Sequence, residues 1–254
     1  MFADVFARVP LELLDAQHEY FLAQGLRPEI YVSGDILTRL TPAAVRRTKR
    51  LLRSFSAHTV HAPFLDLAPG GADADVRSLS LNKMQRLMSL AEDWGSRLVV
   101  MHFNFDAVYY RGYFGGWLER AADFFLELIS SPSAPPLALE NIAEPSPFVY
   151  LQLCERIRSE RIFPCFDFGH HHVFSAIPFD EWLFYLHPRR TIHFHLHDNH
   201  GDRDQHLPLG RGNIDWLRAK KTIVNLGFEF TITLESHTLK DLKESFVFYR
   251  KNFL

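Results

Sequence analysis

The 254-residue sequence holds only two cysteines, Cys154 and Cys165. Two cysteines are too few for a disulfide framework, so we expect both to be core residues in a reduced, cytoplasmic setting. Charged residues interrupt the apolar ones in the N-terminal stretch MFADVFARVPLELL, and no later apolar run is long enough to cross a bilayer. These absences argue against a secreted disulfide-rich domain, a signal peptide and a membrane span.

Neither sign of charge is in excess, because 28 Lys and Arg residues stand against 30 Asp and Glu residues, for a formal net charge of -2. A generally basic nucleic-acid-binding protein is therefore not expected. One predicted helix does carry a basic run, which we interpret as a solvated helix face rather than a nucleic-acid patch. The run consists of Arg46, Arg47, Lys49, Arg50 and Arg53.

The chain also lacks a Pro-, Gly- or Ser-rich linker, so residues 1–254 are expected to form one domain. Short apolar runs alternate with amphipathic stretches such as TPAAVRRTKRLLRSF, in which Thr41 and Pro42 indicate a helix start. The predicted strands are 2–8 (the weakest), 28–33, 57–64, 97–104, 136–142, 163–169, 191–198 and 228–235. Eight strand–helix units predict an α/β fold, a (β/α)₈ TIM barrel, with a doubly wound sheet as the alternative.

Histidine is plentiful, with fourteen in the chain, and residues 191–216 read TIHFHLHDNHGDRDQHLPLGRGNIDW. His193, His195 and His197 alternate along one predicted strand and therefore share a face. Asp198, Asp204 and His206 follow in a polar loop. Imidazole and carboxylate groups are the ligands that zinc, iron and manganese take, so this segment indicates a metal-dependent enzyme.

Other candidate ligands lie at the ends of predicted strands, where the catalytic residues of a barrel gather. They are His61, His102, Glu140, Asp167 with His170, His195 and Glu235. Glu140 and Glu235 end apolar strands, where an unpaired carboxylate would be costly to bury and a metal would offset that cost. Asp167 could instead be a helix-capping residue, but the D-x-x-H spacing favours a ligand pair.

Seven motifs in this order resemble the xylose isomerase-like TIM-barrel superfamily, which includes sugar isomerases and epimerases and the endonuclease IV family. The motifs are TVHAPF, VVMHFN, LALENI, FDFGHH, HLHDN, DRDQHLPLGRG and TLES, between residues 57 and 236. The resemblance implies one to three divalent ions per chain (Zn, Mn, Mg or Fe). The isomerase branch typically uses one ion, held by Glu140, Asp167, His195 and Glu235, with the two glutamates as the catalytic acid and base pair.

The endonuclease IV branch holds three ions. By resemblance, one ion would be held by His61, His102 and Glu140, and a second by Glu140, Asp167, His195 and Glu235. The third would be held by His170, Asp204 and His206. The segment after Glu140 lacks the glycine-rich turn of the nucleases, and Phe64 and Leu65, at the place of their DNA-wedging residues, are more typical of packing. Duplex DNA is therefore an unexpected substrate.

Several residues are expected to support the site without binding metal. We expect His193 and His197 to contact ligand residues rather than a metal. The same holds for His171 and His172, which follow His170 and have at most this role. Arg203, Arg211 and His237 are candidate substrate-binding residues. Gly210-Arg211-Gly212, before a helix that Asn213 is expected to cap, suggests a phosphate site. The aromatic segment 104–117 is either a lid or a cluster packed on the barrel rim.

Two chemistries follow from these residues. The first is a metal-dependent isomerase or epimerase of a small sugar or sugar phosphate, in which one glutamate removes a proton beside a carbonyl and the other returns it. The alternative is a phosphoesterase of the endonuclease IV (AP endonuclease family 2) type with a metal-bridged hydroxide, which the complete ligand set favours. A barrel that only binds metal or sugar for regulation is the third hypothesis. A homo-oligomer is compatible with the sequence.

Overall fold

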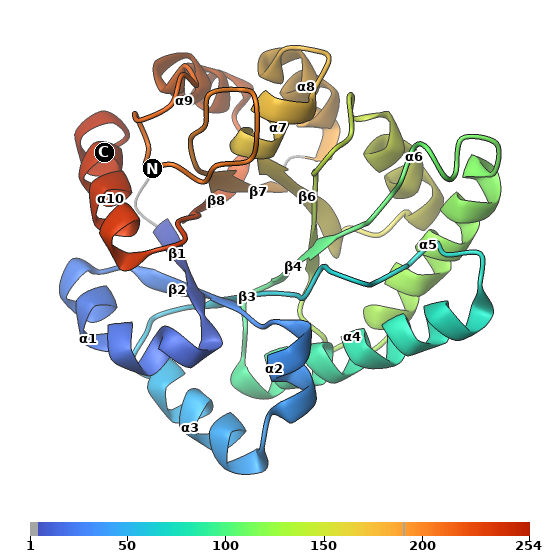
Figure 1. Ribbon diagram of the computed structural model, residues 1–254, viewed down its shortest axis with the longest axis horizontal. Helices are drawn as coiled ribbons and strands as arrows, with labels where there is room; N and C mark the ends of the chain where they lie inside the picture. Colours follow the sequence, from blue (N-terminus) through green and yellow to red (C-terminus); the bar gives the residue numbers. More distant parts are fainter. Residues whose placement is uncertain (1–4, 190) are drawn as a thin grey trace.

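The computed structural model describes residues 5–189 and 191–254, and within them eight parallel strands close into a barrel (Figure 1). β1 pairs with β2 on one side and with β8 on the other, which confirms the TIM barrel and makes the doubly wound alternative wrong. The strands are β1 Val5–Pro10, β2 Arg27–Tyr31, β3 Thr59–His61, β4 Val99–His102, β5 Leu137–Glu140, β6 Ile162–Asp167, β7 Thr191–Leu196 and β8 Glu229–Leu234.

Helices surround the barrel as an outer ring in Figure 1. They are α1 Leu14–Gln24, α2 Gly34–Arg39, α3 Pro42–Leu52, α4 Ala74–Trp94, α5 Phe114–Leu128, α6 Phe148–Ile157, α7 Phe168–Phe174, α8 Phe179–Leu186, α9 Trp216–Leu226 and α10 Leu239–Asn252, with short 3₁₀ turns at Leu11–Leu13 and His187–Arg189. The predicted start of α3 is confirmed, since the Thr41 hydroxyl accepts a hydrogen bond from the backbone N–H of Ala44 and Pro42 is the first helical residue.

Successive side chains along each strand point alternately toward the surrounding helices and into the barrel, so the protein has two buried regions. Residues such as Met101, Leu139 and Phe194 belong to the large apolar cluster between the strands and the helices. Their neighbours along the strands, such as Glu140 and His195, face the barrel interior and are also fully buried. The interior of this barrel is therefore rich in polar side chains at the level where the strands end.

Most predicted strands are longer than the observed ones, because the residues at their ends already belong to the connecting turns. The first strand lies at Val5–Pro10 rather than 2–8, and residues 2–4 of that prediction lie outside the described residues. The long helix α4 begins at Ala74, because the Asp73 side chain accepts hydrogen bonds from the backbone N–H groups of Asp75 and Val76. In the part of the chain that the structure describes, no helix is long and apolar enough to span a membrane.

Candidate metal centre

The structure brings the nine predicted ligand residues together at the carboxyl end of the barrel, in three adjacent groups. Within each group the candidate ligand atoms lie within 4.8 Å of one another. The groups are His61, His102 and Glu140; Glu140, Asp167, His195 and Glu235; and His170, Asp204 and His206, joined by His197. Glu140 belongs to two of them, so its two oxygens could bridge neighbouring ions.

The first group is built on β3, β4 and β5. Nε2 of His61 and Nε2 of His102 each lie 3.1 Å from Oε2 of Glu140. The other ring nitrogen of His61, Nδ1, donates to the carbonyl of Ala62 at 2.8 Å. That hydrogen bond fixes the ring and leaves Nε2 free to bind an ion, which is the arrangement common for metal-binding histidines.

The second group is built on β5, β6, β7 and the end of β8. Nδ1 of His195 lies 3.1 Å from Oε1 of Glu140, 3.8 Å from Oδ2 of Asp167 and 3.5 Å from Oε2 of Glu235. All four side chains are at most 7% exposed. The four residues offer ligand atoms that all lie within 4.8 Å of one another.

The third group combines α7 with the turn Asp204-Gln205-His206. Nε2 of His170 lies 3.4 Å from Oδ2 of Asp204, and Nε2 of His206 lies 3.2 Å from the same oxygen. Nδ1 of His170 donates to the Asn141 carbonyl at 3.0 Å, so its Nε2 is free. His206 adopts a positive φ of 49°, which lets one tight turn present both of its ligand side chains.

Several buried atoms of these groups have no hydrogen-bond partner among the described residues. They are Oδ2 of Asp167, Oε2 of Glu235, Nδ1 of His206, Nε2 of His195 and both ring nitrogens of His197. An unpaired buried carboxylate oxygen costs free energy, and a cation removes that cost. The donor set and its unpaired atoms therefore fit a divalent ion bound by nitrogen and oxygen ligands.

The second oxygen of each of these two carboxylates is held by a residue outside the second group. Oδ1 of Asp167 accepts from the backbone N–H of His170 at 2.6 Å and lies 3.0 Å from Nε2 of His197. Asp167 thus caps a helix through Oδ1 and is a candidate metal ligand through Oδ2. The two roles considered for Asp167 from the sequence are therefore compatible. Oε1 of Glu235 lies 3.3 Å from Nε of Arg8, whose guanidinium stacks over the Tyr31 ring.

His197 fits the expected supporting role better than that of a ligand. Its ring is stacked on that of His206, with centroids 3.8 Å apart and planes within 10°. An imidazole binds metal in its own ring plane, so two parallel rings at this separation cannot both direct a lone pair at one ion. The contact of His197 with Asp167 gives it a different task, which is to orient that carboxylate.

The charge state of the glutamates suits metal binding. Burial by itself raises the pKa of Glu140, but the neighbouring His195 and His102 outweigh burial and hold that pKa well below its usual value. The pKa of Glu235 is also low, because His195 and His206 outweigh the effect of burial. Both side chains are therefore carboxylates at neutral pH, as an ion requires of its ligands.

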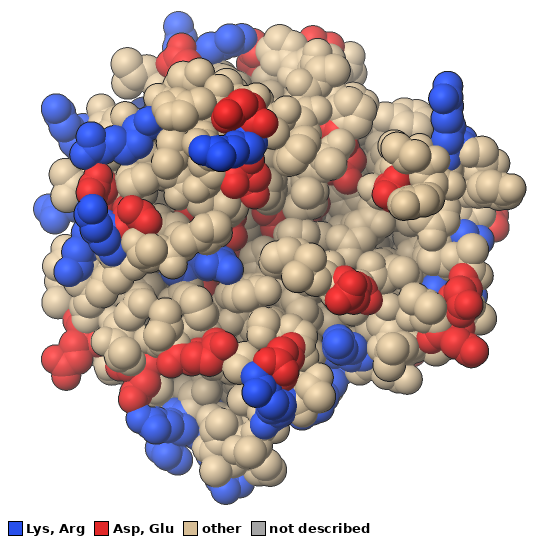
Figure 2. All heavy atoms as spheres, in the orientation of Figure 1, with Lys and Arg blue, Asp and Glu red and all other residues tan. Residues whose placement is uncertain are grey.

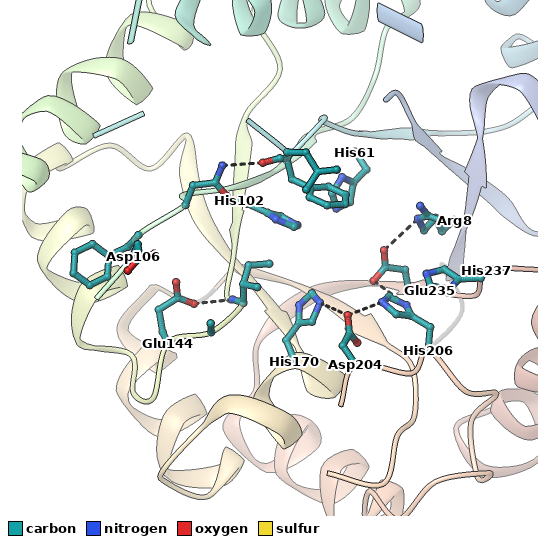
Figure 3. A pocket seen from close by; sticks show the side chains of 16 residues that line it. Arg8, His61, His102, Asp106, Glu144, His170, Asp204, His206, Glu235 and His237 are labelled. Atoms are coloured by element: carbon teal, nitrogen blue, oxygen red, sulfur yellow. Dashed lines mark hydrogen bonds and ion pairs between the residues drawn. The ribbon is translucent and has the colours of Figure 1, made fainter. Parts of the chain in front are cut away.

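Six of the nine candidate ligands line a pocket of about 480 Å³, which we call the central pocket: His61, His102, His170, Asp204, His206 and Glu235. Imidazole and carboxylate groups form one wall, and Phe64, Leu65, Phe105 and Ile142 line the apolar side. Figure 3 shows Arg8, His237 and Glu235 together on one side and Glu144 and Asp106 on the other. Figure 2 shows Lys and Arg interspersed with Asp and Glu around the rim of this face, which is hollowed near its centre.

The three predicted substrate-binding residues have different positions. His237 lines the central pocket and stacks on His206 with centroids 4.2 Å apart. Arg203 and Arg211 are exposed and do not line this pocket. Arg211 instead forms an ion pair with Glu244 at 3.0 Å on the surface.

The predicted phosphate loop has another role in the structure. Asp215, not Asn213, caps the following helix, since its side chain accepts from the backbone N–H of Arg218. Gly212 packs so closely that a Cβ there would lie 2.2 Å from the carbonyl oxygen of Asn199 and 2.3 Å from Oδ1 of Asp198. Acceptor oxygens at this distance are unsuited to an anion, so the glycines serve packing.

Asp198 organises this loop. Its carboxylate accepts hydrogen bonds from Gly210, Ile214 and the indole N–H of Trp216. With both oxygens used in this way, Asp198 is a structural residue.

The aromatic segment 104–117 packs on the barrel rim. The Phe105 ring contacts Trp117 and Phe114, with centroids 4.8 and 5.5 Å apart, and the last residues of the segment already belong to α5. Tyr109 and Tyr113 remain more than 70% exposed. The inner residues, such as Phe105, Phe114 and Trp117, therefore form the predicted aromatic cluster. Only the outer residues, such as Tyr109 and Tyr113, are exposed and free to form a lid.

Three residues of the site were missed by sequence reasoning. Arg8 comes from the weakest predicted strand, and Glu29 lies in the middle of its strand, away from the strand end where ligands are expected. Glu144 lines the central pocket, and burial raises its pKa to about 7. The only signal for Glu29 and Glu144 was an acidic residue at an apolar strand or strand exit.

Comparison with known proteins places the chain in a family. The family model of the xylose isomerase-like TIM barrel matches residues 28–252. The Methanocaldococcus jannaschii protein MJ1311 is 27% identical over 195 residues, which cover 73% of this chain and 66% of that protein, slightly under two thirds of its length.

Two solved structures share the fold. One, described as a D-tagatose 3-epimerase-like protein, has a TM-score of 0.85 at 23% identity and covers 98% of this chain and 96% of its own. The TTHB071 protein from Thermus thermophilus, from a crystal soaked with ZnCl₂, has a TM-score of 0.78 at 24% identity, with 98% of both chains covered. The family match extends over most of the sequence, and the chain therefore belongs to the xylose isomerase-like TIM barrel family.

Proposed function

We propose that this protein is a divalent-metal-dependent epimerase or isomerase of a small sugar or sugar phosphate. The observation that carries the proposal is the second ligand group, in which unpaired oxygens of Asp167 and Glu235 meet Nδ1 of His195 and Oε1 of Glu140. A pocket of about 480 Å³ beside this group suits a monosaccharide. The structural likeness to a D-tagatose 3-epimerase-like protein supports the same class of substrate.

The two glutamates have different tasks in this reaction. A divalent ion, when bound, would polarise the substrate carbonyl and acidify the neighbouring C–H group. Glu235 lines the central pocket and is ionised, which is the form that can accept that proton, so we assign it the role of the base. Glu140, ionised in the resting protein, would return a proton to the second carbon or to the opposite face after taking one up from solvent, and Glu235 would release its proton to solvent to complete the cycle. Phe64 and Phe105 would exclude water from the apolar side of the sugar.

A second candidate function is hydrolysis of a small phosphoester, and the surroundings of Glu140 favour it. Four histidines lie within 3.3 Å of its two oxygens: His61, His102, His170 and His195. A carboxylate surrounded in this way suits a bridge between ions better than a proton shuttle. The further ligand groups would then hold the additional ions that phosphoester hydrolysis commonly uses.

Deuterium exchange tests the proposed reaction directly. Metal-loaded protein incubated in D₂O with a panel of ketoses and ketose phosphates should introduce deuterium at the carbon beside the carbonyl, as measured by NMR. Elemental analysis of the same sample should give one ion per chain for the epimerase. Two or three ions together with hydrolysis of bis(p-nitrophenyl) phosphate, and no exchange into any sugar, would establish the second candidate instead.

His206→Ala separates the two chemistries in one protein. The substitution removes a ligand of the third group and leaves the second group intact. Epimerase activity should therefore largely remain, whereas a three-ion hydrolase should lose most of its activity. His200→Ala, which replaces an exposed histidine of the same loop that does not line the central pocket, is the matched control.

A further inference from the structure

Below the candidate ligands, the barrel interior holds a second polar layer built around Glu29 of β2. This carboxylate is 0% exposed. Its Oε2 accepts hydrogen bonds from the hydroxyls of Thr59 and Thr233, each at 2.9 Å, and lies 3.1 Å from Nε2 of His193. Barrel interiors at this depth are usually filled by branched apolar side chains, so a buried acid here requires a reason.

The other oxygen of Glu29 faces the metal centre from below. Oε1 lies 2.9 Å from Nε2 of His195, and the opposite ring nitrogen of His195 is the one that lies among the second ligand group. The contact is a close ion-pair distance without hydrogen-bond alignment, since neither Oε1 of Glu29 nor Nε2 of His195 has a hydrogen-bond partner among the described residues. A proton on Nε2 would face this buried anion and leave the Nδ1 lone pair for an ion. His61 and His170 are fixed by backbone carbonyls, whereas His195 faces a fully buried anion.

We propose that Glu29 is a positioning residue of the metal centre, which holds His195 in the Nε2–H form and directs Nδ1 at the ion. The role rests on the proposed function in taking His195 as a ligand. The hydroxyls of Thr59 and Thr233 fix Glu29 itself, and β2, β3, β7 and β8 all contribute to the network. A carboxylate behind a ligand histidine also makes the ring a stronger donor to the metal.

Two variants test this role by zinc affinity. Glu29→Gln keeps the shape but allows the amide to donate to Nε2, which would move the His195 proton to Nδ1 and block the ligand atom. Glu29→Asp keeps the charge but withdraws it by one methylene from His195. In competition titrations of metal-free protein with Zn²⁺ against a chromophoric chelator, both should weaken binding by about 10- to 100-fold.

Thr231→Val is the matched control, because the Thr231 hydroxyl belongs to the same layer but hydrogen-bonds Nδ1 of His193, at 2.6 Å, rather than Glu29. Its zinc affinity should stay close to that of the unmodified protein. NMR of ¹⁵N-histidine-labelled, metal-free protein should show the His195 signals of an Nε2–H ring, and in Glu29→Gln those of a mixture or of the Nδ1–H ring.

The outcomes separate the two proposals. If Glu29→Gln and Glu29→Asp bind zinc as tightly as the unmodified protein, or if His195 keeps its tautomer in Glu29→Gln, the role of Glu29 is overturned. If the unmodified protein binds no divalent ion, the proposed function itself fails. Should Glu29→Gln not fold, the Glu29→Asp titration and the tautomer of the unmodified protein still decide.

Discussion

In Glu235 and Asp167, two of the candidate ligands of the second group, the two carboxylate oxygens have different surroundings. In Glu235, Oε1 is paired with Arg8 and Oε2 has no hydrogen-bond partner within the described part of the chain, and in Asp167 the same division separates Oδ1 from Oδ2. A side chain held at one atom loses little further freedom when the other binds an ion. The centre is therefore preorganised by its outer contacts rather than by the ion alone.

Arg8→Met should release Glu235 from this arrangement. Because the ion pair is largely buried, its loss leaves a carboxylate free to rotate away from His195. We expect zinc affinity to fall by about tenfold, measured by competition titration. Arg27→Met, on the neighbouring strand β2, is the control and should bind zinc normally. Equal affinity in Arg8→Met and the unmodified protein would contradict the proposed preorganisation.

His58 lies outside this centre and predicts a pH dependence of stability. Burial lowers its pKa from 6.5 to about 4 in the folded protein. Because the unfolded chain binds the proton first, the stability that neutral His58 provides is complete above pH 6.5 and is lost as the pH falls to 4. This difference corresponds to about 3 kcal/mol.

His58→Leu should remove that contribution. Urea unfolding between pH 7 and pH 4 should show a shallower decrease in the free energy of unfolding for the variant than for the unmodified protein. The two proteins should differ little at pH 7. Parallel curves over the whole range would show that His58 is not the group responsible.

At the scale of elements, close packing at the start of α7 determines the position of a residue that contacts the metal centre. Gly169, its second residue, lies directly against His197, and a Cβ at this position would be 2.0 Å from the His197 ring. The imidazole can therefore reach Asp167 only because the helix carries no side chain here. This requirement gives the glycine in FDFGHH a physical reason.

Gly169→Ala should displace His197 and cost about 1–3 kcal/mol of stability by overpacking. Zinc affinity should fall as well, since Asp167 loses the contact that orients it. Gly115→Ala in α5 is the control, because a Cβ there meets nothing within 4 Å, and it should stabilise the helix by about 0.5–1 kcal/mol. Thermal unfolding and zinc titration of both variants check this, and a Gly169→Ala protein as stable as Gly115→Ala would contradict it.

The pattern of apolar strands was enough to predict the barrel and to predict that candidate ligands at the strand ends lie close together. His61, Glu140 and Glu235 could be found because each ends an apolar run, a local signal. Glu29 could not be found in this way, since its partner His193 is 164 positions away and their contact exists only across the closed barrel. The cap at Asp215 was missed for a local reason, because two equally suitable capping residues stand two positions apart.

At the scale of the whole molecule, ions bound to groups drawn from many strands should stabilise the entire fold. Zinc at 100 times its dissociation constant contributes about 2.7 kcal/mol per site. For a chain of 254 residues this corresponds to an increase in Tm of roughly 5–10 °C. Differential scanning calorimetry with zinc and with excess chelator measures it, and Asp167→Asn should show a smaller increase. An unchanged Tm would argue against a metal centre.

The spread of the second ligand group along the chain also sets the order of events during synthesis. Its members lie between Glu140 and Glu235, and the residue that orients Glu235, Arg8, comes from the first strand. A nascent chain whose eighth strand has not yet been made lacks the ligand Glu235 and cannot close the barrel. Ion uptake at this group would consequently be a late step of folding, after the eighth strand has joined the barrel.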